Sequence, residues 1–163
     1  MARKWVVNAS PLIVLGRLSQ LPLLTELAQI LVVPAAVAQE IIQGPGEDPA
    51  RVWLSTAGRE FVEESRPIEP VVAAWDLGAG ESAVISRALR SPDFEAILDD
   101  LAARKCAAAL SVPIRGTLGV LLLAKKEGLI TKLAPLLSDL QRAGFHIKPD
   151  VLDTIRRLGE TPE

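Results

Sequence analysis

The segment EAILDDLAARKCAAAL, residues 95–110, decides the fold class that this sequence predicts. It begins with a short apolar run at 95–98, continues through two aspartates and ends in an alanine-rich pattern that predicts a helix over 101–110. Other short apolar runs along the chain are also followed by longer helical patterns. This alternation is typical of an α/β domain that is built on a parallel sheet.

The same pattern of apolar residues predicts the remaining strands and helices. We predict strands at 5–7, 30–33, 95–98 and 112–114, and a weaker strand at 60–63. We expect helices at about 11–18, 21–29, 34–43, 50–59, 80–89, 101–110, 117–126, 131–143 and 149–158. Ser10 is expected to cap the first helix, with Pro11 at its first position. Residues 43–49 and 64–80 are expected to be loops, the second with one turn of helix near 71–75.

Length and composition limit the class of protein. The 163 residues suit a single domain over 1–163, and the 49% apolar fraction with a net charge of −2 excludes intrinsic disorder and a globally basic nucleic-acid binder. The single cysteine and single histidine exclude a disulfide framework, a cysteine-rich zinc site and a metal centre made of several imidazoles. With no run of 18 apolar residues and no signal-peptide pattern, we expect a cytoplasmic protein that does not enter a membrane.

Polar residues fall where an α/β sheet binds its ligands, beyond the carboxyl ends of the strands. Two of them follow the strand at 5–7 and two follow the strand at 95–98, whereas one glutamate lies roughly two turns into the helix at 34–43 and another in the first turn of the helix at 80–89. These candidate site residues are Asn8, Ser10, Glu40, Glu81, Asp99 and Asp100.

Four carboxylates at one edge repel one another unless a cation offsets their charge. Mg²⁺ and Mn²⁺ prefer oxygen ligands, and such ions activate water in phosphodiester cleavage without histidine or cysteine. Each acid also has a structural interpretation. Asp99 and Asp100 are good N-caps for the helix at 101–110, Glu81 suits any first helical turn, and Glu40 suits a solvated helix face.

A basic stretch supports a polyanionic partner. Residues 101–148 carry eight basic and two acidic side chains, a local charge of +6, and lysine and arginine supply most of the sequence-independent affinity for nucleic acid. Arg104, Lys105 and Arg115 are the candidate nucleic-acid contacts, although the same pattern also suits a solvated basic helix face. Residues 115–119 lack the spacing and the lysine of a P-loop, so Thr117 is expected to cap the helix at 117–126 and to support the site.

Four segments together resemble the PIN-domain superfamily: VVNASPLIVLGRL (6–18), VVPAAVAQEI (32–41), LGAGESAVISRA (77–88) and ILDDLAARKCAAALSVPIRGTLGVLLLAKKEGLI (97–130). The resemblance spans about residues 4–160 and is greatest to an uncharacterised prokaryotic branch of predicted nucleic-acid-binding proteins related to VapC-like toxins. It implies a three-layer α/β/α fold with a central parallel sheet of four to five strands, and Mg²⁺- or Mn²⁺-dependent cleavage of single-stranded RNA.

The resemblance also implies roles for particular residues. Glu40, Glu81 and Asp99, with Asp100 beside them, would be the catalytic and metal-binding acids, and Ser10 would orient the groups around the ion. The first acidic position of the superfamily falls on Asn8, an amide that can ligate a hard cation but carries no charge and cannot act as a base.

Three functional hypotheses follow. The first is a metal-dependent ribonuclease that is the toxin of a toxin–antitoxin pair. The second is a non-catalytic PIN-like module that binds RNA or a protein partner, with a metal site weakened by Asn8. The third is a small-molecule or phosphoryl-transfer domain of flavodoxin-like type, for which Asn8 to Pro11 make a poor phosphate loop because proline lacks an N–H. The apolar helices at 11–18 and 21–29 suit either a homodimer or antitoxin interface or the core.

Overall fold

The computed structural model describes residues 2–159, which fall into two compact units that divide between Thr117 and Leu118. All candidate site residues lie in the first unit. The expectation of one domain over 1–163 stays a prediction.

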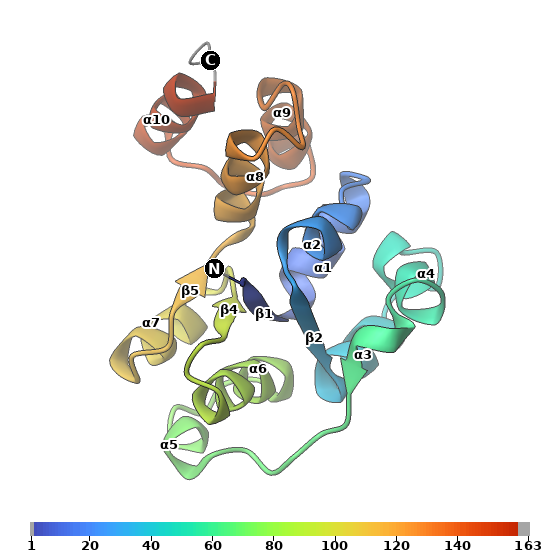
Figure 1. The fold of residues 1–163 in the computed structure, drawn as a ribbon, viewed down its shortest axis with the longest axis vertical. Coiled ribbons are helices and arrows are strands. Elements are labelled where there is room, and N and C mark those ends of the chain that lie inside the picture. The colour runs from blue at the N-terminus through green and yellow to red at the C-terminus, as the bar shows by residue number, and fades with distance from the viewer. Residues whose placement is uncertain (1, 160–163) are drawn as a thin grey trace. The chain divides into compact units, whose positions relative to one another are not determined.

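The first unit contains a five-stranded, all-parallel sheet in the order β3-β2-β1-β4-β5 (Figure 1). The strands are β1 Lys4–Val7, β2 Ile30–Pro34, β3 Val62–Glu63, β4 Glu95–Ile97 and β5 Ile114–Arg115. The strand order reverses direction between β1 and β4, and α/β sheets bind ligands beside such a switch point. The predicted α/β class with four to five parallel strands is confirmed.

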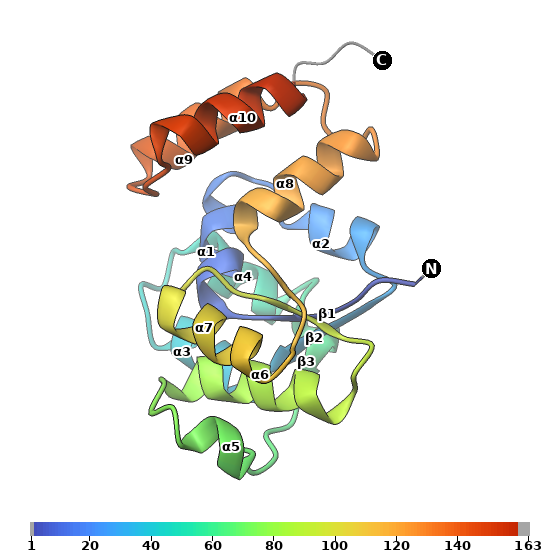
Figure 2. The same cartoon turned by 90° about the vertical axis from the view of Figure 1, so that its left-hand side faces the viewer.

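Helices cover both faces of this sheet. They are α1 Ala9–Arg17, α2 Pro22–Leu27, α3 Ala35–Ile42, α4 Pro49–Ser55, α5 Pro70–Ala73, α6 Ala79–Arg90 and α7 Leu101–Ala109, with a 3₁₀ turn at Arg59–Phe61. Figure 2 shows α1 and α2 on one side of the strands and α6 on the other, with α5 beyond α6. The three-layer architecture is therefore present.

Three local predictions were wrong. Ser10 does not cap the first helix, because α1 already begins at Ala9 with Asn8 at the N-cap, and Pro11 is accommodated in the first turn, where no N–H is needed. The last strand begins at Ile114 instead of 112, since the Val112 N–H donates to the carbonyl of Ala107 and closes the end of α7. Residues 59–61 form a 3₁₀ turn, so only 62–63 of the predicted strand pair with β2.

The core of this unit is made by the sheet and the inner faces of its helices. Trp5, Val6 and Val7 of β1 are fully buried, and so are Leu12 and Leu15 of α1. Burying each such large apolar side chain contributes about 1.5–3 kcal/mol to folding. The apolar residues of α1 and α2 therefore serve the core, while a homodimer or antitoxin interface stays a prediction. Cys106 is buried in α7, as its alanine-rich surroundings predict.

The described part of the second unit, which starts at Leu118, holds all but the first residue of α8 Thr117–Lys126, and the helices α9 Ala134–Arg142 and α10 Pro149–Gly159. They lie where the sequence predicts helices. Leu137 and Leu140 of α9 are buried one turn apart, and Ile155 is buried in α10. Among the residues that the structure describes, no helix has the length and apolar character that crossing a membrane requires.

Candidate functional site

Asn8 stands at the end of β1, beside the switch point of the sheet. Its backbone N–H donates to the carbonyl of Ile97 in β4 (3.1 Å), which fixes the residue between the two central strands. The side chain is 96% buried, and its Oδ1 is the one buried side-chain polar atom in residues 2–159 that has no hydrogen-bond partner. An unsatisfied buried acceptor lowers the stability of the fold by about 1–3 kcal/mol, and a bound water or cation would remove this cost.

Glu40 of α3 and Asn8 both have a side-chain oxygen close to Gly80 of α6. A Cβ placed on Gly80 would lie 3.3 Å from Glu40 Oε1 and 3.4 Å from Asn8 Oδ1. Both oxygens therefore border the same small space, which is open because residue 80 has no side chain. The structure thus brings together two candidate residues that are 32 positions apart in the chain.

Glu81 follows in the first turn of α6. Its Oε2 accepts a hydrogen bond from the Gly78 N–H (3.1 Å). Burial raises the pKa of the Glu81 carboxyl, the Gly78 hydrogen bond opposes this, and the negative charges of Asp100 and Glu40 raise the pKa further. Repulsion that reaches Glu81 from both neighbours shows that these three acids share one region of negative potential.

The two aspartates after β4 have different partners. Asp99 Oδ1 accepts from the Thr117 N–H (2.8 Å) and Asp99 Oδ2 from Thr117 Oγ1 (2.5 Å), so this carboxylate fixes Thr117, the last residue of the first unit. Asp100 is the N-cap of α7 and accepts from the Ala103 N–H (3.0 Å). The helix-cap interpretation therefore holds for Asp100 at α7, whereas Asp99 binds Thr117 and does not cap α7.

The donor set fits a hard cation in part. Asn8 Oδ1 and Glu40 Oε1 are the oxygen donors that Mg²⁺ and Mn²⁺ prefer, and the unpartnered Asn8 oxygen is free to ligate. Within residues 2–159, no three acidic, histidine or cysteine side chains converge as a ready metal site. The wider ligand set with Glu81, Asp99 and Asp100 stays a prediction.

The predicted supporting and basic residues lie in different surroundings. Arg104 Nη1 and Asp99 Oδ1 would each be 3.1 Å from a Cβ on Gly116, so this arginine lies beside the acidic edge. Lys105 is exposed on α7. Arg115 Nε instead pairs with Glu95 Oε1 (3.0 Å), which also accepts from Trp5 Nε1 (2.9 Å).

Ser10 lies half-buried in the first turn of α1. In the described part of the chain its side chain makes no hydrogen bond to any of the acids, so its proposed orienting role stays a prediction.

A comparison with protein families identifies the family of this chain. A family model of the PIN domain matches residues 4–160. The chain belongs to the PIN-domain family. PIN domains have nuclease-type functions and generally use divalent metal ions. No curated protein matches this PIN domain.

Gly80 is the residue of this site that the sequence reading missed. Its signal is the second glycine of Gly78-Ala79-Gly80, which lies inside the helix, where glycine costs up to about 1 kcal/mol relative to alanine, whereas Gly78 stands at the N-cap, where glycine is well tolerated. Such a cost indicates that the backbone must leave space for something, here the two oxygens of Asn8 and Glu40.

Proposed function

We propose that this PIN domain is a Mg²⁺- or Mn²⁺-dependent endoribonuclease that cleaves single-stranded RNA in the cytoplasm, as the toxin of a toxin–antitoxin pair. The observation that carries the proposal is the unpartnered Asn8 Oδ1, which borders the same space as Glu40 Oε1 at the end of β1. A cation there satisfies the buried oxygen and offsets the repulsion that reaches Glu81 from Asp100 and Glu40.

In this proposal Asn8 and Glu40 hold the cation, and the nearby acids add negative potential. When bound, the ion supplies an activated water and stabilises the leaving oxygen of the phosphodiester. Asp99, whose oxygens both accept hydrogen bonds from Thr117, keeps the chain after β5 fixed beside the edge. In the same proposal, Arg104 and Lys105 of α7 contact RNA phosphates, whereas the Nε of Arg115 is already paired with Glu95.

A second candidate function is a non-catalytic module that binds RNA or a protein partner. The neutral side chain of Asn8 favours it, because an amide contributes one negative charge less than a carboxylate at the same position and lowers the affinity for a divalent cation. An antitoxin and a second copy of the chain are the protein partners that we propose in either case.

Incubation of the full chain with a labelled single-stranded RNA distinguishes the two functions. We expect cleavage with Mn²⁺ or Mg²⁺, none with EDTA, and at least a tenfold slower reaction for Glu40→Gln. Glu26→Gln, an exposed glutamate of α2, is the matched control and should cleave as wild type. RNA that is bound but stays intact supports the non-catalytic module, and cleavage by Glu40→Gln at the wild-type rate contradicts the proposed site.

The toxin role has its own test. Induced expression of the wild-type chain should arrest the growth of a bacterial host, and expression of Glu40→Gln to the same level should not. Normal growth with an RNA-cleaving wild-type protein would leave the nuclease in place and refute the toxin role.

A further inference from the structure

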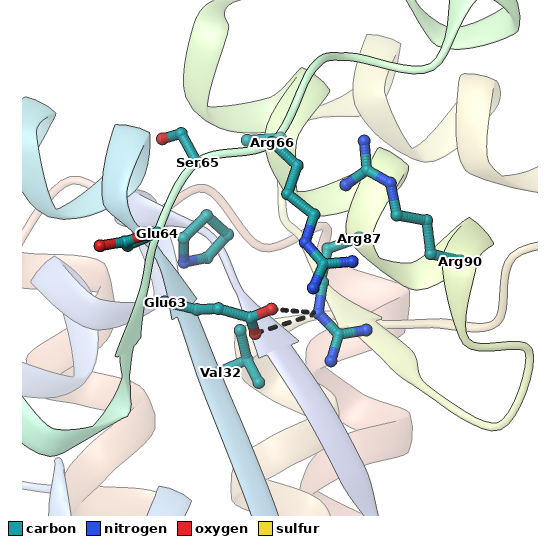
Figure 3. Close-up of a pocket in the computed structure, with 9 residues that line it drawn as sticks. Val32, Glu63, Glu64, Ser65, Arg66, Arg87 and Arg90 are labelled. Carbon is teal, nitrogen blue, oxygen red and sulfur yellow. Dashed lines mark hydrogen bonds and ion pairs between the residues drawn. The ribbon is translucent and has the colours of Figure 1, made fainter.

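A cavity apart from the candidate acids Glu40, Glu81, Asp99 and Asp100 is lined by three arginines together with Glu63 and Glu64. It lies between β2, the end of β3 with the loop after it, and α6, and Arg66, Arg87 and Arg90 line it (Figure 3). Its volume is about 20 Å³, which is enough for one water molecule or one phosphate oxygen and too small for a nucleobase. A ligand therefore enters it only with a small polar group.

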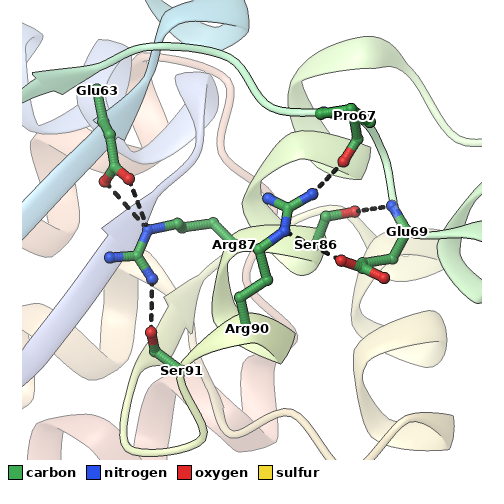
Figure 4. Close-up of polar contacts among 7 residues, drawn as sticks. All are labelled: Glu63, Pro67, Glu69, Ser86, Arg87, Arg90 and Ser91. Atoms are coloured by element: carbon green, nitrogen blue, oxygen red, sulfur yellow. Dashed lines mark hydrogen bonds and ion pairs between the residues drawn. The ribbon is translucent and has the colours of Figure 1, made fainter.

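Arg87 is held rigidly at one side of this cavity. Its Nε lies 3.0 and 3.1 Å from the two carboxylate oxygens of Glu63, and its Nη1 donates to Ser91 Oγ (2.9 Å). The guanidinium carbon also lies 4.4 Å from the centre of the Phe94 ring. These contacts fix the plane of the guanidinium and leave the Nη2 hydrogens without a partner among the described residues (Figure 4).

Arg90 is fixed in a similar way, one turn further along α6. Its Nε donates to Glu69 Oε1 (3.0 Å) and its Nη2 to the carbonyl of Pro67 (Figure 4). The Glu69 N–H in turn donates to Ser86 Oγ (3.1 Å). These bonds tie the loop before α5 to α6, and they use neither hydrogen of Arg90 Nη1.

Arg66 differs from the other two arginines. It lies on the exposed loop after β3, and within residues 2–159 it has neither an ion pair nor a side-chain hydrogen bond. Its guanidinium nevertheless points toward that of Arg87, while the carboxylate of neighbouring Glu64 points away from both arginines (Figure 3). Glu63 already offsets the charge of Arg87, so Arg66 adds the positive charge that has no partner beside it among the described residues, and a guanidinium forms charge-assisted hydrogen bonds to an anion.

We propose that this pocket binds a phosphate group, with Arg66 and the free N–H groups of Arg87 and Arg90 as donors. Arg87 and Arg90 have a structural role, because they fix the segment at 63–69 to α6, whereas Arg66 makes no such contact. Guanidinium donors match phosphate oxygens, and donors that are already fixed lose little entropy on binding. The phosphate comes either from the backbone of an RNA strand, a source that rests on the proposed function, or from a free mononucleotide or inorganic phosphate.

Binding measured in EDTA tests the pocket without cleavage. Fluorescence anisotropy follows a labelled single-stranded oligoribonucleotide, and calorimetry follows AMP and inorganic phosphate. We expect Arg66→Ala to weaken the binding of at least one of these probes about 5- to 20-fold and Arg66→Lys to weaken it less. Arg59→Ala, an equally exposed arginine of the 3₁₀ turn, should bind as wild type. Both alanine variants remove an exposed side chain, and thermal denaturation checks that they fold.

The pattern of losses identifies the source of the phosphate. If Arg66→Ala weakens the binding of RNA but of neither AMP nor inorganic phosphate, and the slope of log K against log salt falls by about 0.7, the pocket binds an RNA phosphate. Loss with AMP or inorganic phosphate assigns it to a small phosphate compound. Equal binding by Arg66→Ala and Arg59→Ala, or no binding of any probe by wild type, overturns the proposal.

Cleavage with Mn²⁺ is followed in parallel on the same proteins. A wild-type protein that binds phosphate through Arg66 and leaves RNA intact with Mn²⁺ refutes the nuclease and supports the pocket. If wild type cleaves RNA but its binding of the probes does not depend on Arg66, the result supports the nuclease and refutes the pocket.

Discussion

Replacing Gly80 by alanine separates the stability of the fold from the binding of a cation. Gly80 is the second residue of α6, and the new Cβ would lie 3.3 Å from Glu40 Oε1, 3.4 Å from Asn8 Oδ1 and 3.5 Å from Val37 Cγ2. The first of these contacts is slightly tighter than ordinary van der Waals contact and the other two are close to it. The methyl group therefore fits after small shifts, but it takes up the space that the two oxygens share.

The two effects of this substitution have opposite signs. Alanine stabilises a helix interior by up to about 1 kcal/mol relative to glycine, and the close contacts reduce that gain, so we expect a change in unfolding free energy between about 0 and +1 kcal/mol. Mg²⁺ and Mn²⁺ bind oxygen at roughly 2.0–2.2 Å, which leaves no room for a methyl carbon beside both donors. We therefore expect the affinity for Mn²⁺ to fall at least about tenfold, a loss of about 1.4 kcal/mol.

Thermal denaturation with and without Mn²⁺, together with calorimetric titration, measures both effects. The Tm of wild type should rise as Mn²⁺ is added, because a ligand that binds the native state stabilises it, and the Tm of Gly80→Ala should stay constant. Gly46→Ala is the control, since its Cβ would meet only Arg51 Nη1 at 3.6 Å. A Gly80→Ala protein that binds Mn²⁺ as wild type does would refute a cation site between Asn8 and Glu40.

Further substitutions test single groups of the edge. Asn8→Asp should raise Mn²⁺ affinity and the cleavage rate about tenfold or more by adding a charged ligand, which calorimetry and the RNA assay measure, and an unchanged affinity would argue against Asn8 as a ligand. Thr117→Val should cost about 1–2 kcal/mol in urea denaturation, because it removes the hydroxyl that donates to Asp99, and a loss near zero would mean that this bond does not stabilise the fold. The raised pKa of Glu81 means that its folded form binds protons more readily than its unfolded form, so its contribution to stability is present at low pH and lost as pH rises through its folded pKa. Glu81→Gln should therefore gain stability relative to wild type between pH 4 and pH 7 without divalent ions, and a pH-independent difference would contradict this.

The sequence predicts the sheet and most of its helices because their signals are local. A strand followed by a capped helix is visible in residues 95–110, and the rule that parallel strands end at one edge correctly brings Asn8 and Glu40 together. The position of the first N-cap was mistaken, since Asn8 and Ser10 are both good capping residues and their order of preference does not decide between them.

Contacts between distant segments were beyond the sequence reading. Thr117 binds Asp99 from 18 residues away, and no spacing rule connects the two. The arginine pocket joins the loop after β3 to α6 through side chains 17 to 24 residues apart. In the sequence, Arg87 and Arg90 resemble the solvated basic residues at the end of any helix. Only the fold shows that these two arginines and Arg66 line one cavity.

Calorimetric titration of Mn²⁺ into wild type and Glu40→Gln tests the central claim most directly. The claim is that this PIN domain holds a divalent cation between Asn8 and Glu40 although the first ligand is neutral. We predict one Mn²⁺ site per chain in wild type, and a loss of affinity of at least about tenfold in Glu40→Gln, with Glu26→Gln unchanged. A wild-type protein that binds no Mn²⁺, or a Glu40→Gln protein that binds it equally well, would contradict the claim.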